Sequence, residues 1–186
     1  MDMSNQPHIR GTVVRLEAAD MTLAYGDCPE PGILVRTSLG DSFTSGTAKG
    51  STCHWRDGRG GDAVTIGPFL PIDFGQNSDA LRAMAKLKLE QPGGEADVQE
   101  EDGVRGTFSW RWRVVRRETV TVKAGSFDTV LVEAVRSGDR GNHESLRRYW
   151  YVPALRVIVR YEARAVRGVL FGDSGDWEAV EVRRTQ

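Results

Sequence analysis

Cysteine and histidine side chains commonly bind metals and attach cofactors, and the two residue types are adjacent at Cys53 and His54. Haem attachment requires Cys-x-x-Cys-His, which the sequence lacks. A zinc site requires three or four ligands at suitable spacing, and no second cysteine and histidine cluster lies nearby. Asp57 and Asp62 follow in the next loop, but they do not complete a ligand set. We therefore expect no metal and no cofactor.

A Gly-Asp-Ser-Gly tetrad at Gly172–Gly175 matches the residues around the nucleophile of trypsin-like proteases. A serine nucleophile also needs a histidine base that a carboxylate orients. The three histidines are His8, His54 and His143, and none lies in the Ala-Ala-His-Cys context that this chemistry uses. Glycine, aspartate and serine are also preferred in turns for backbone reasons. The tetrad therefore predicts a turn, and we expect no catalytic residue and a protein that is not an enzyme.

The two cysteines of the chain, Cys28 and Cys53, lie in polar, turn-rich segments. If they are paired, the disulfide restricts the unfolded chain and raises the free energy of unfolding by about 3 kcal/mol. Such a bond is typical of a protein in an oxidising compartment. If they are free, they are two thiols of a cytosolic protein. The polar start, Met1–Arg10, is not the apolar part of a signal peptide. It fits a cytosolic protein, or a mature form from which a leader has been removed.

Aromatic and basic residues alternate from Trp110 to Arg113, after Phe108 and Ser109. In a strand, Phe108, Trp110 and Trp112 point to one face, and the arginines between and after the tryptophans point to the other. A groove for single-stranded nucleic acid presents both kinds of side chain on one exposed face, so we expect no nucleic-acid partner. We predict instead that the three aromatic residues line the concave side of a sheet and bind an apolar or lipid-like ligand.

Short runs with period-two alternation, separated by Gly, Asp, Asn and Pro, dominate the sequence and predict strands joined by turns. The doublets Val114-Val115 and Arg116-Arg117 interrupt one run and predict a β-bulge or a strand end. The predicted strands are Val104–Val122, Asp128–Arg136, Ser145–Val152, Leu155–Val166 and Trp177–Arg183, with less regular candidates at Arg10–Leu16, Met21–Tyr25, Ile33–Ser38, Ser51–Trp55 and Ala63–Ile66.

Only one helix is predicted, at Asp79–Leu89 with Ser78 as its N-cap, and the acidic segment Gln91–Gly103 is interpreted as an exposed loop. In Leu155–Val166 the alternation places Val157, Val159 and Tyr161 on one face. The predicted fold class is mainly β, with a single curved antiparallel sheet or half-open barrel and little helix. We expect residues 1–186 to form a single β-rich domain.

Charge is unevenly distributed, although the whole chain has a net charge of −1. Residues 1–103 carry a net charge of −7, and residues 104–186 carry +6. Such asymmetry sometimes indicates an anionic partner for the basic half. The alternation of arginines on strand faces explains most of it without one, because the two halves of one domain offset each other.

Three segments of the second half resemble a family of uncharacterised bacterial envelope proteins. They are Arg117–Val130, with its Glu-x-Val-Thr-Val-x-Ala-Gly-x-Phe-Asp-Thr pattern, Tyr149–Pro153 (Tyr-Trp-Tyr-Val-Pro), and Val157–Glu162. The resemblance covers residues 104–166 well and the remainder loosely. Lys123 and Leu155-Arg156 depart from the family, which often has Pro and Leu-Gly there. The resemblance implies the half-open barrel of periplasmic lipoprotein carriers, and it supplies no catalytic residue.

Two functional hypotheses follow from these observations. The first is a periplasmic or outer-membrane-associated protein that holds a lipid or another apolar small molecule against Phe108, Trp110 and Trp112. The second is an envelope interaction or assembly module. In the second hypothesis, arginines of residues 105–113 or 156–164 contact an acidic envelope protein or lipid head groups.

Overall fold

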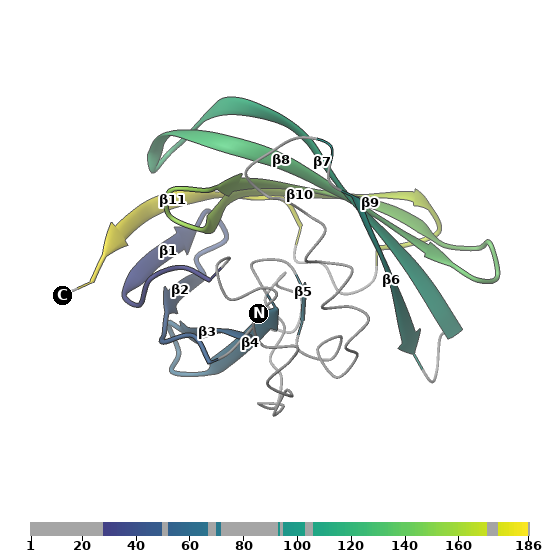
Figure 1. Cartoon of the computed structure of the whole chain (residues 1–186), viewed down its shortest axis with the longest axis horizontal. Coiled ribbons are helices and arrows are strands. Elements are labelled where there is room, and N and C mark those ends of the chain that lie inside the picture. The colour runs from purple at the N-terminus through teal and green to yellow at the C-terminus, as the bar shows by residue number, and fades with distance from the viewer. Residues whose placement is uncertain are drawn as a thin grey trace.

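The computed structural model describes residues 28–49, 52–66, 70–71, 93, 95–102, 106–170 and 175–185. These residues contain no helix, and their strands form an eleven-stranded antiparallel sheet that curls into a half-barrel (Figure 1). The strands are β1 (Ile33–Thr37), β2 (Ser42–Ser45), β3 (Thr52–Asp57), β4 (Asp62–Ile66), β5 (Leu70–Pro71), β6 (Glu95–Asp102), β7 (Gly106–Val122), β8 (Gly125–Gly138), β9 (Glu144–Val152), β10 (Val157–Arg167) and β11 (Trp177–Arg184).

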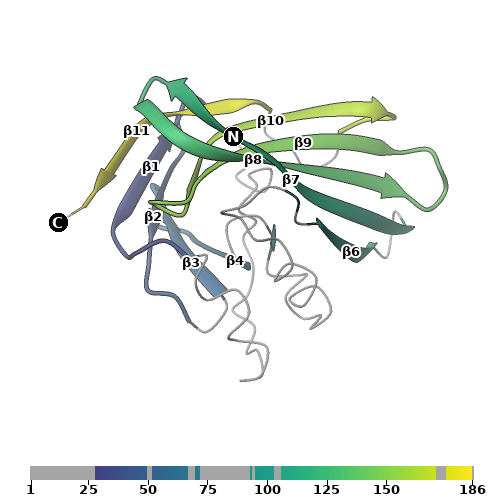
Figure 2. The same ribbon diagram turned by 45° about the horizontal axis from the view of Figure 1, so that its top comes forward.

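Strands that follow one another in the sequence pair side by side within β1–β5 and within β6–β11. The pairing of β1 with β11 connects these two groups into one sheet. The order across the sheet is β5-β4-β3-β2-β1-β11-β10-β9-β8-β7-β6. The long strands β7 to β10 form an arch, and β1 to β4 lie beneath one end of it (Figure 2). The mainly β fold class, with a half-barrel sheet, is therefore confirmed. No helix in the described part of the chain has the length and apolar character needed to cross a bilayer.

The longest hairpin, β7–β8, follows from the most regular alternation in the sequence. Its strands pair from Phe108 opposite Gly138 to Val122 opposite Gly125. Gly125 has a positive φ of 136°, which a residue with a side chain rarely adopts, and this explains a glycine at the turn. The pairing shifts register between Val114 and Arg116, so the predicted bulge is confirmed.

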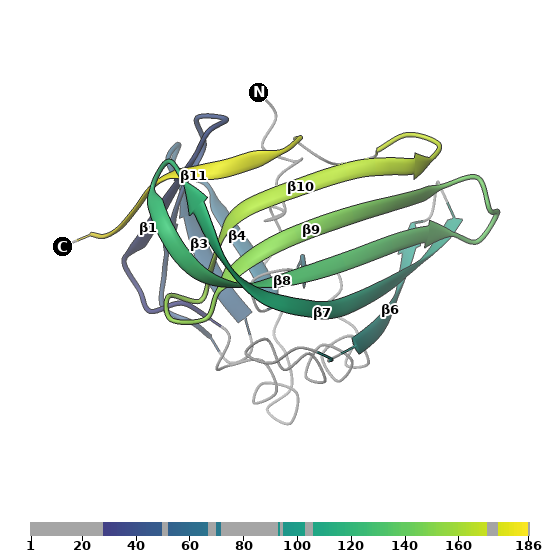
Figure 3. The same ribbon diagram turned by 90° about the horizontal axis from the view of Figure 1, so that it is seen from above.

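The sheet buries opposite faces on the two sides of this bulge. In β8, Val130, Leu131 and Val132 are all buried although neighbouring residues of a strand point to opposite faces. Toward the hairpin turn, Leu131 shares its buried face with Val120 and Val122. Away from the turn, the buried face is the opposite one. The hairpin curls beside β11 in the view from above (Figure 3), and the backbone N–H of Ala124 donates to the carbonyl of Ala179.

A second bulge corrects the predicted faces of Leu155–Val166. The register of β10 against β9 shifts between Ile158 and Arg160, so Tyr161 pairs with Tyr149. Val157 and Val159 instead point to the other face, where they belong to the hydrophobic core cluster described next. The prediction of one common face was wrong because the inserted residue reverses the alternation.

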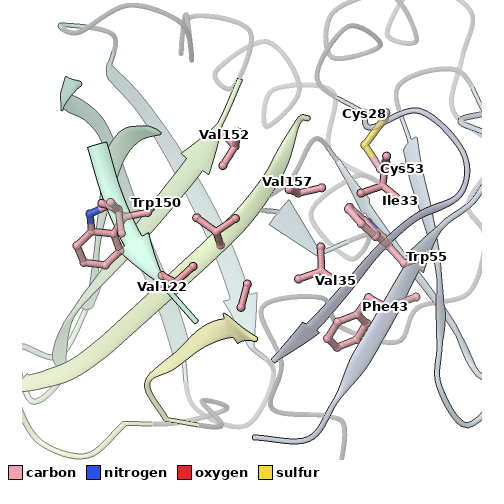
Figure 4. Packing of buried hydrophobic residues seen from close by; sticks show 14 of the residues in the cluster. Cys28, Ile33, Val35, Phe43, Cys53, Trp55, Val122, Trp150, Val152 and Val157 are labelled. Atoms are coloured by element: carbon pink, nitrogen blue, oxygen red, sulfur yellow. A yellow bond between two sulfur atoms is a disulfide. The ribbon is translucent and has the colours of Figure 1, made fainter. Parts of the chain in front are cut away.

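The hydrophobic core at this end of the sheet joins the two halves of the chain. It packs side chains of β1–β4 and β11 with those of β7–β10 (Figure 4). Trp55 is 3% exposed, and its indole N–H donates to the hydroxyl of Thr65. The members are Cys28, Ile33, Val35, Phe43, Cys53, Trp55, Ala63, Val120, Val122, Leu131, Trp150, Val152, Val157, Val159 and Ala179.

Other strand predictions vary in outcome. Those around β1, β3, β4 and β7–β11 are confirmed within a few residues at each end, whereas β2 was not predicted. The prediction of a loop at Gln91–Gly103 was wrong, since β6 pairs along its length with β7. The candidates Arg10–Leu16 and Met21–Tyr25, the helix Asp79–Leu89 and most of the Gly172–Gly175 turn lie outside the described residues.

Candidate functional site

A row of neighbouring aromatic rings crosses the buried face of the sheet between β7 and β11. Trp112 is 1% exposed and lies 5.6 Å from Trp110 and 5.4 Å from Tyr149, measured between ring centroids. Tyr149 lies 5.1 Å from Tyr161, which in turn lies 6.1 Å from Trp177. Each separation falls in the range where aromatic pairs attract one another. We call these five residues the aromatic row.

Strand β8 lies between the strands that carry Trp112 and Tyr149, and it contributes Ala134 to the same face. Ala134 on β8 pairs with Trp112 on β7, so the two side chains share a face. It lies between the strands that carry Trp112 and Tyr149 and is fully buried. On β9, Ala134 pairs with Arg147 and Val132 pairs with Tyr149, so Trp112 and Tyr149 lie diagonally across β8. The row spans four strand spacings, or about 19 Å at the usual separation of neighbouring strands.

Two buried arginines lie at the β7 end of the aromatic row. The guanidinium carbon of Arg136 is 3.7 Å from the ring centroid of Phe108 and 5.5 Å from that of Trp110. The guanidinium carbon of Arg147 is 4.6 Å from the ring centroid of Trp110. Both arginines are 4% exposed, so these cation–π contacts are shielded from water and stronger than surface ones.

Histidine and serine complete this corner of the sheet. The rings of His143 and Phe108 meet edge to face with centroids 5.5 Å apart. The Ser145 hydroxyl is 3.4 Å from Nε2 of His143, and it accepts a hydrogen bond of 2.9 Å from Nη1 of Arg147. A serine and a histidine are also the start of a nucleophilic pair, but the hydroxyl of Ser145 is fully buried and occupied by Arg147. Its geometry therefore fits a structural bond.

An open groove lies on the same face as the aromatic row, toward the hairpin turn. Its volume is about 470 Å³, within the range of small-molecule sites. Val130, in its wall, pairs with Tyr151, which is two residues along β9 from Tyr149. The described residues that line it are Arg117, Glu118, Thr119, Asp128, Thr129, Val130, Pro153 and Ala154. The predicted ligand-binding residues Phe108, Trp110 and Trp112 are not among them.

Trp177, at the β11 end of the row, carries a buried donor with no acceptor. Its side chain is 4% exposed, and the indole N–H makes no hydrogen bond in the structure. Leaving such a donor unsatisfied costs about 1–3 kcal/mol. A polar atom brought within hydrogen-bond distance of this N–H would recover that free energy.

The opposite face of the same strands carries charged side chains that pair with one another. Arg111 contacts Asp97, with N and O atoms 3.1 Å apart. Glu133 accepts from both Arg113 and Arg148 at 2.9 Å. Partial burial raises the pKa of Glu133, but the hydrogen bonds from Arg148 and Arg113 outweigh it, and the pKa lies below its ordinary value. The arginines of this face thus already have acidic partners within the sheet.

The sequence predicted that three of these aromatic residues share one face, and their role in binding a ligand stays a prediction. The structure brings Phe108, Trp110 and Trp112 to one face, with Arg111 and Arg113 exposed on the other. The sequence analysis did not single out four neighbouring residues of this face, Arg136, Arg147, His143 and Ser145. The available signal was alternation, because Arg136 continues the Val132, Ala134 series of β8, and Arg147 precedes Tyr149 and Tyr151 at spacing two.

The two cysteines form a disulfide that ties the segment before β1 to β3, with Cα atoms 5.2 Å apart. Beside it, burial lowers the pKa of His54 below its ordinary value, and nearby Lys49 lowers it further while Asp62 opposes the shift. Among the described residues, no group of three or more His, Cys, Asp or Glu side chains is placed to hold a metal ion. The expectations of no metal, no cofactor and no catalytic residue stay predictions.

No protein-family model matches the sequence, and no curated protein matches it. Similar solved structures include a candidate exported protein with a YmcC-like fold from Bacteroides fragilis, at 15% identity and a TM-score of 0.43, covering 84% of this chain and 98% of that one. A candidate lipoprotein from Parabacteroides distasonis has 14% identity and a TM-score of 0.42, covering 86% and 99%. The hypothetical lipoprotein YmcC from Escherichia coli has 13% identity and a TM-score of 0.45, covering 92% and 90%.

These similar structures are thus of candidate exported proteins and lipoproteins. At such identities and TM-scores, the similarity carries no functional argument for this chain. Membership of the envelope family that residues 104–166 resemble stays a prediction.

Proposed function

We propose that this chain is a non-enzymatic protein of the bacterial cell envelope, periplasmic or associated with the outer membrane, that holds an apolar or lipid-like ligand against its aromatic row. The observation that carries the proposal is the row itself, which ends at the unpartnered indole N–H of Trp177. A face built of flat rings about 19 Å long accepts an extended acyl chain or a planar ring system without the specific shape that aliphatic packing imposes.

Two further observations support this reading. The groove beside Val130 and Ala154 opens on the same face as the aromatic row, and Val130 in its wall pairs with Tyr151 on β9. The disulfide between Cys28 and Cys53 is typical of a protein in an oxidising compartment. We infer that a ligand reaches the inner face through this groove.

Binding of a neutral apolar probe tests the proposal. We expect N-phenyl-1-naphthylamine to bind saturably, with its fluorescence excited through the tryptophans of the row. Ala154→Trp places a large side chain at the exposed rim of the groove and should weaken or slow this binding. Val169→Trp adds the same side chain at a position that is 57% exposed and outside the groove, so it is the matched control.

A linear, non-saturable fluorescence response in the unmodified protein would contradict the proposal. Equal loss of binding in both tryptophan variants would show that the ligand does not enter through the groove. The alternative function, an assembly module that uses an arginine-rich face, has less support, because Arg111, Arg113 and Arg148 contact acids of their own sheet.

A further inference from the structure

The large apolar side chains that are exposed among the described residues both lie at one end of the sheet. Val166 is 58% exposed and Val169 is 57% exposed. They lie in and just after the last turn-ward residues of β10, at the end of the arch that is remote from β1–β4 (Figure 3). The register of β10 against β9 shifts between Ala165 and Arg167, so Val166 has no partner on β9. A bulge re-aims the side chains around it, which accounts for a valine turned to solvent.

The turn between β8 and β9 packs against this end of β10. Nη1 of Arg167 donates to the carbonyl of Gly141 at 2.8 Å. Gly168 has a φ of +75°, and a Cβ there would lie 2.6 Å from a carbonyl oxygen of the turn. Residues 138–142 and 163–170 therefore form one structural unit, which we call the tip.

The tip also carries an excess of positive charge. Its one acidic residue is Asp139, and its exposed arginines are Arg140, Arg164 and Arg167. In the described part of the chain, Arg140 and Arg167 form no ion pair, and Arg164 approaches Glu162 only at 4.0 Å. The tip thus differs from the exposed face of β7–β9, whose arginines have acidic partners within the sheet.

We infer that the tip docks on a membrane surface of anionic phospholipids. Apolar side chains gain from burial in the head-group region, and arginines beside them bind the phosphates and are attracted by the negative surface. A stable protein interface needs about 20–30 residues a side, whereas the tip is two short segments with two large apolar side chains. A bilayer requires no complementary shape, so it fits the tip better than an acidic protein does. The inference needs no bound ligand and is independent of the proposed function.

Sedimentation of the full chain with sucrose-loaded vesicles tests the inference. We expect binding to vesicles of equal parts phosphatidylglycerol and phosphatidylcholine at low salt, weaker binding at high salt, and little binding to phosphatidylcholine alone. R140Q/R164Q should lower the partition coefficient about thirtyfold, because each arginine near such a surface contributes about fivefold. V166S/V169S should lower it about tenfold, because the apolar side chains that gain from burial are lost.

R111Q/R113Q is the matched control for charge. It removes the same number of arginines from the exposed face of the same sheet, where both side chains are more than half exposed, and it should bind nearly as well as the unmodified protein. If R140Q/R164Q does not fold, R140Q alone changes one exposed side chain of the turn and should lower the partition coefficient about fivefold.

Absence of binding to the anionic vesicles would overturn the inference and leave an acidic protein as the partner of the tip. Equal binding to neutral vesicles would also overturn it, because the arginines would then contribute nothing. Equal losses in R140Q/R164Q and R111Q/R113Q would do the same, since binding would follow net charge alone. None of these outcomes affects the proposed function, which the neutral probe tests separately.

Discussion

Removal of the disulfide has an effect that the structure allows us to work out. Cys28 and Cys53 are 25 residues apart in sequence, and the loop that they close contains β1 and β2. Opening a loop of this length adds to the entropy of the unfolded chain and lowers the free energy of unfolding by about 3.5 kcal/mol at 25 °C. For a chain of this size, that corresponds to a fall of about 10 °C in Tm.

Urea denaturation of C28A/C53A and of the unmodified protein measures this difference. Trp55 is 3% exposed and belongs to the same hydrophobic cluster as both cysteines, so tryptophan fluorescence reports on unfolding of this region. Reduction of the unmodified protein should lower its midpoint to near that of the variant, and the variant should not respond to reductant. Equal midpoints for oxidised and reduced protein would refute the reasoning, as would two titratable thiols in the folded, air-oxidised protein.

Three further predictions concern single side chains. Arg156 has a φ of +57°, a strained region for a residue with a side chain, so Arg156→Gly should be more stable to urea than Arg156→Ala by about 1 kcal/mol. Oδ1 of Asp57 accepts from the backbone N–H groups of Arg59 and Gly61, so Asp57→Ala should lower the free energy of unfolding by about 2 kcal/mol. Because the pKa of Glu133 is lowered on folding, its contribution to stability is present above the unfolded pKa near 4.5 and is lost as pH falls below it. The urea midpoints of Glu133→Gln and the unmodified protein should therefore converge between pH 6 and pH 3.

Each of these predictions has a contrary outcome. Equal stability of the glycine and alanine variants at position 156 would show that the turn is not strained there. An unchanged urea midpoint for Asp57→Ala would show that its two hydrogen bonds are replaced by solvent. A constant difference across pH for Glu133→Gln would mean that the carboxylate gains nothing from its arginine partners.

The strands that could be predicted are those whose side chains alternate strictly. On either side of the bulge, β7 and β8 bury apolar residues on one face only. Apolar residues therefore recur at every second position in their sequences. β2 has one large apolar residue, Phe43, because its other buried residue is the polar Ser45, and Ser42 and Thr44 are only partly buried. β6 is mostly acidic and follows Pro92 and Gly93, so its composition indicates a loop. Its strand is fixed by pairing with β7, which a local pattern does not contain.

The candidate site was only partly predictable for a related physical reason. Aromatic residues on an apolar face are recognised readily, and Trp110 and Trp112 were. Arginine is normally exposed, so Arg136 and Arg147 looked like surface residues until the tertiary structure placed aromatic rings over them. The sequence also did not predict that the buried face changes at the bulges. This change depends on which residue of the bulged strand has no partner on the neighbouring strand.

The central claim is that the aromatic row holds the apolar part of a ligand. Native mass spectrometry of the protein isolated from its own cells, with parallel lipid extraction, tests this most directly. We predict an adduct of lipid mass that excess hexadecanoic acid displaces from the protein. A bare polypeptide mass that stays unchanged when excess hexadecanoic acid and hexadecanol are added would contradict the claim.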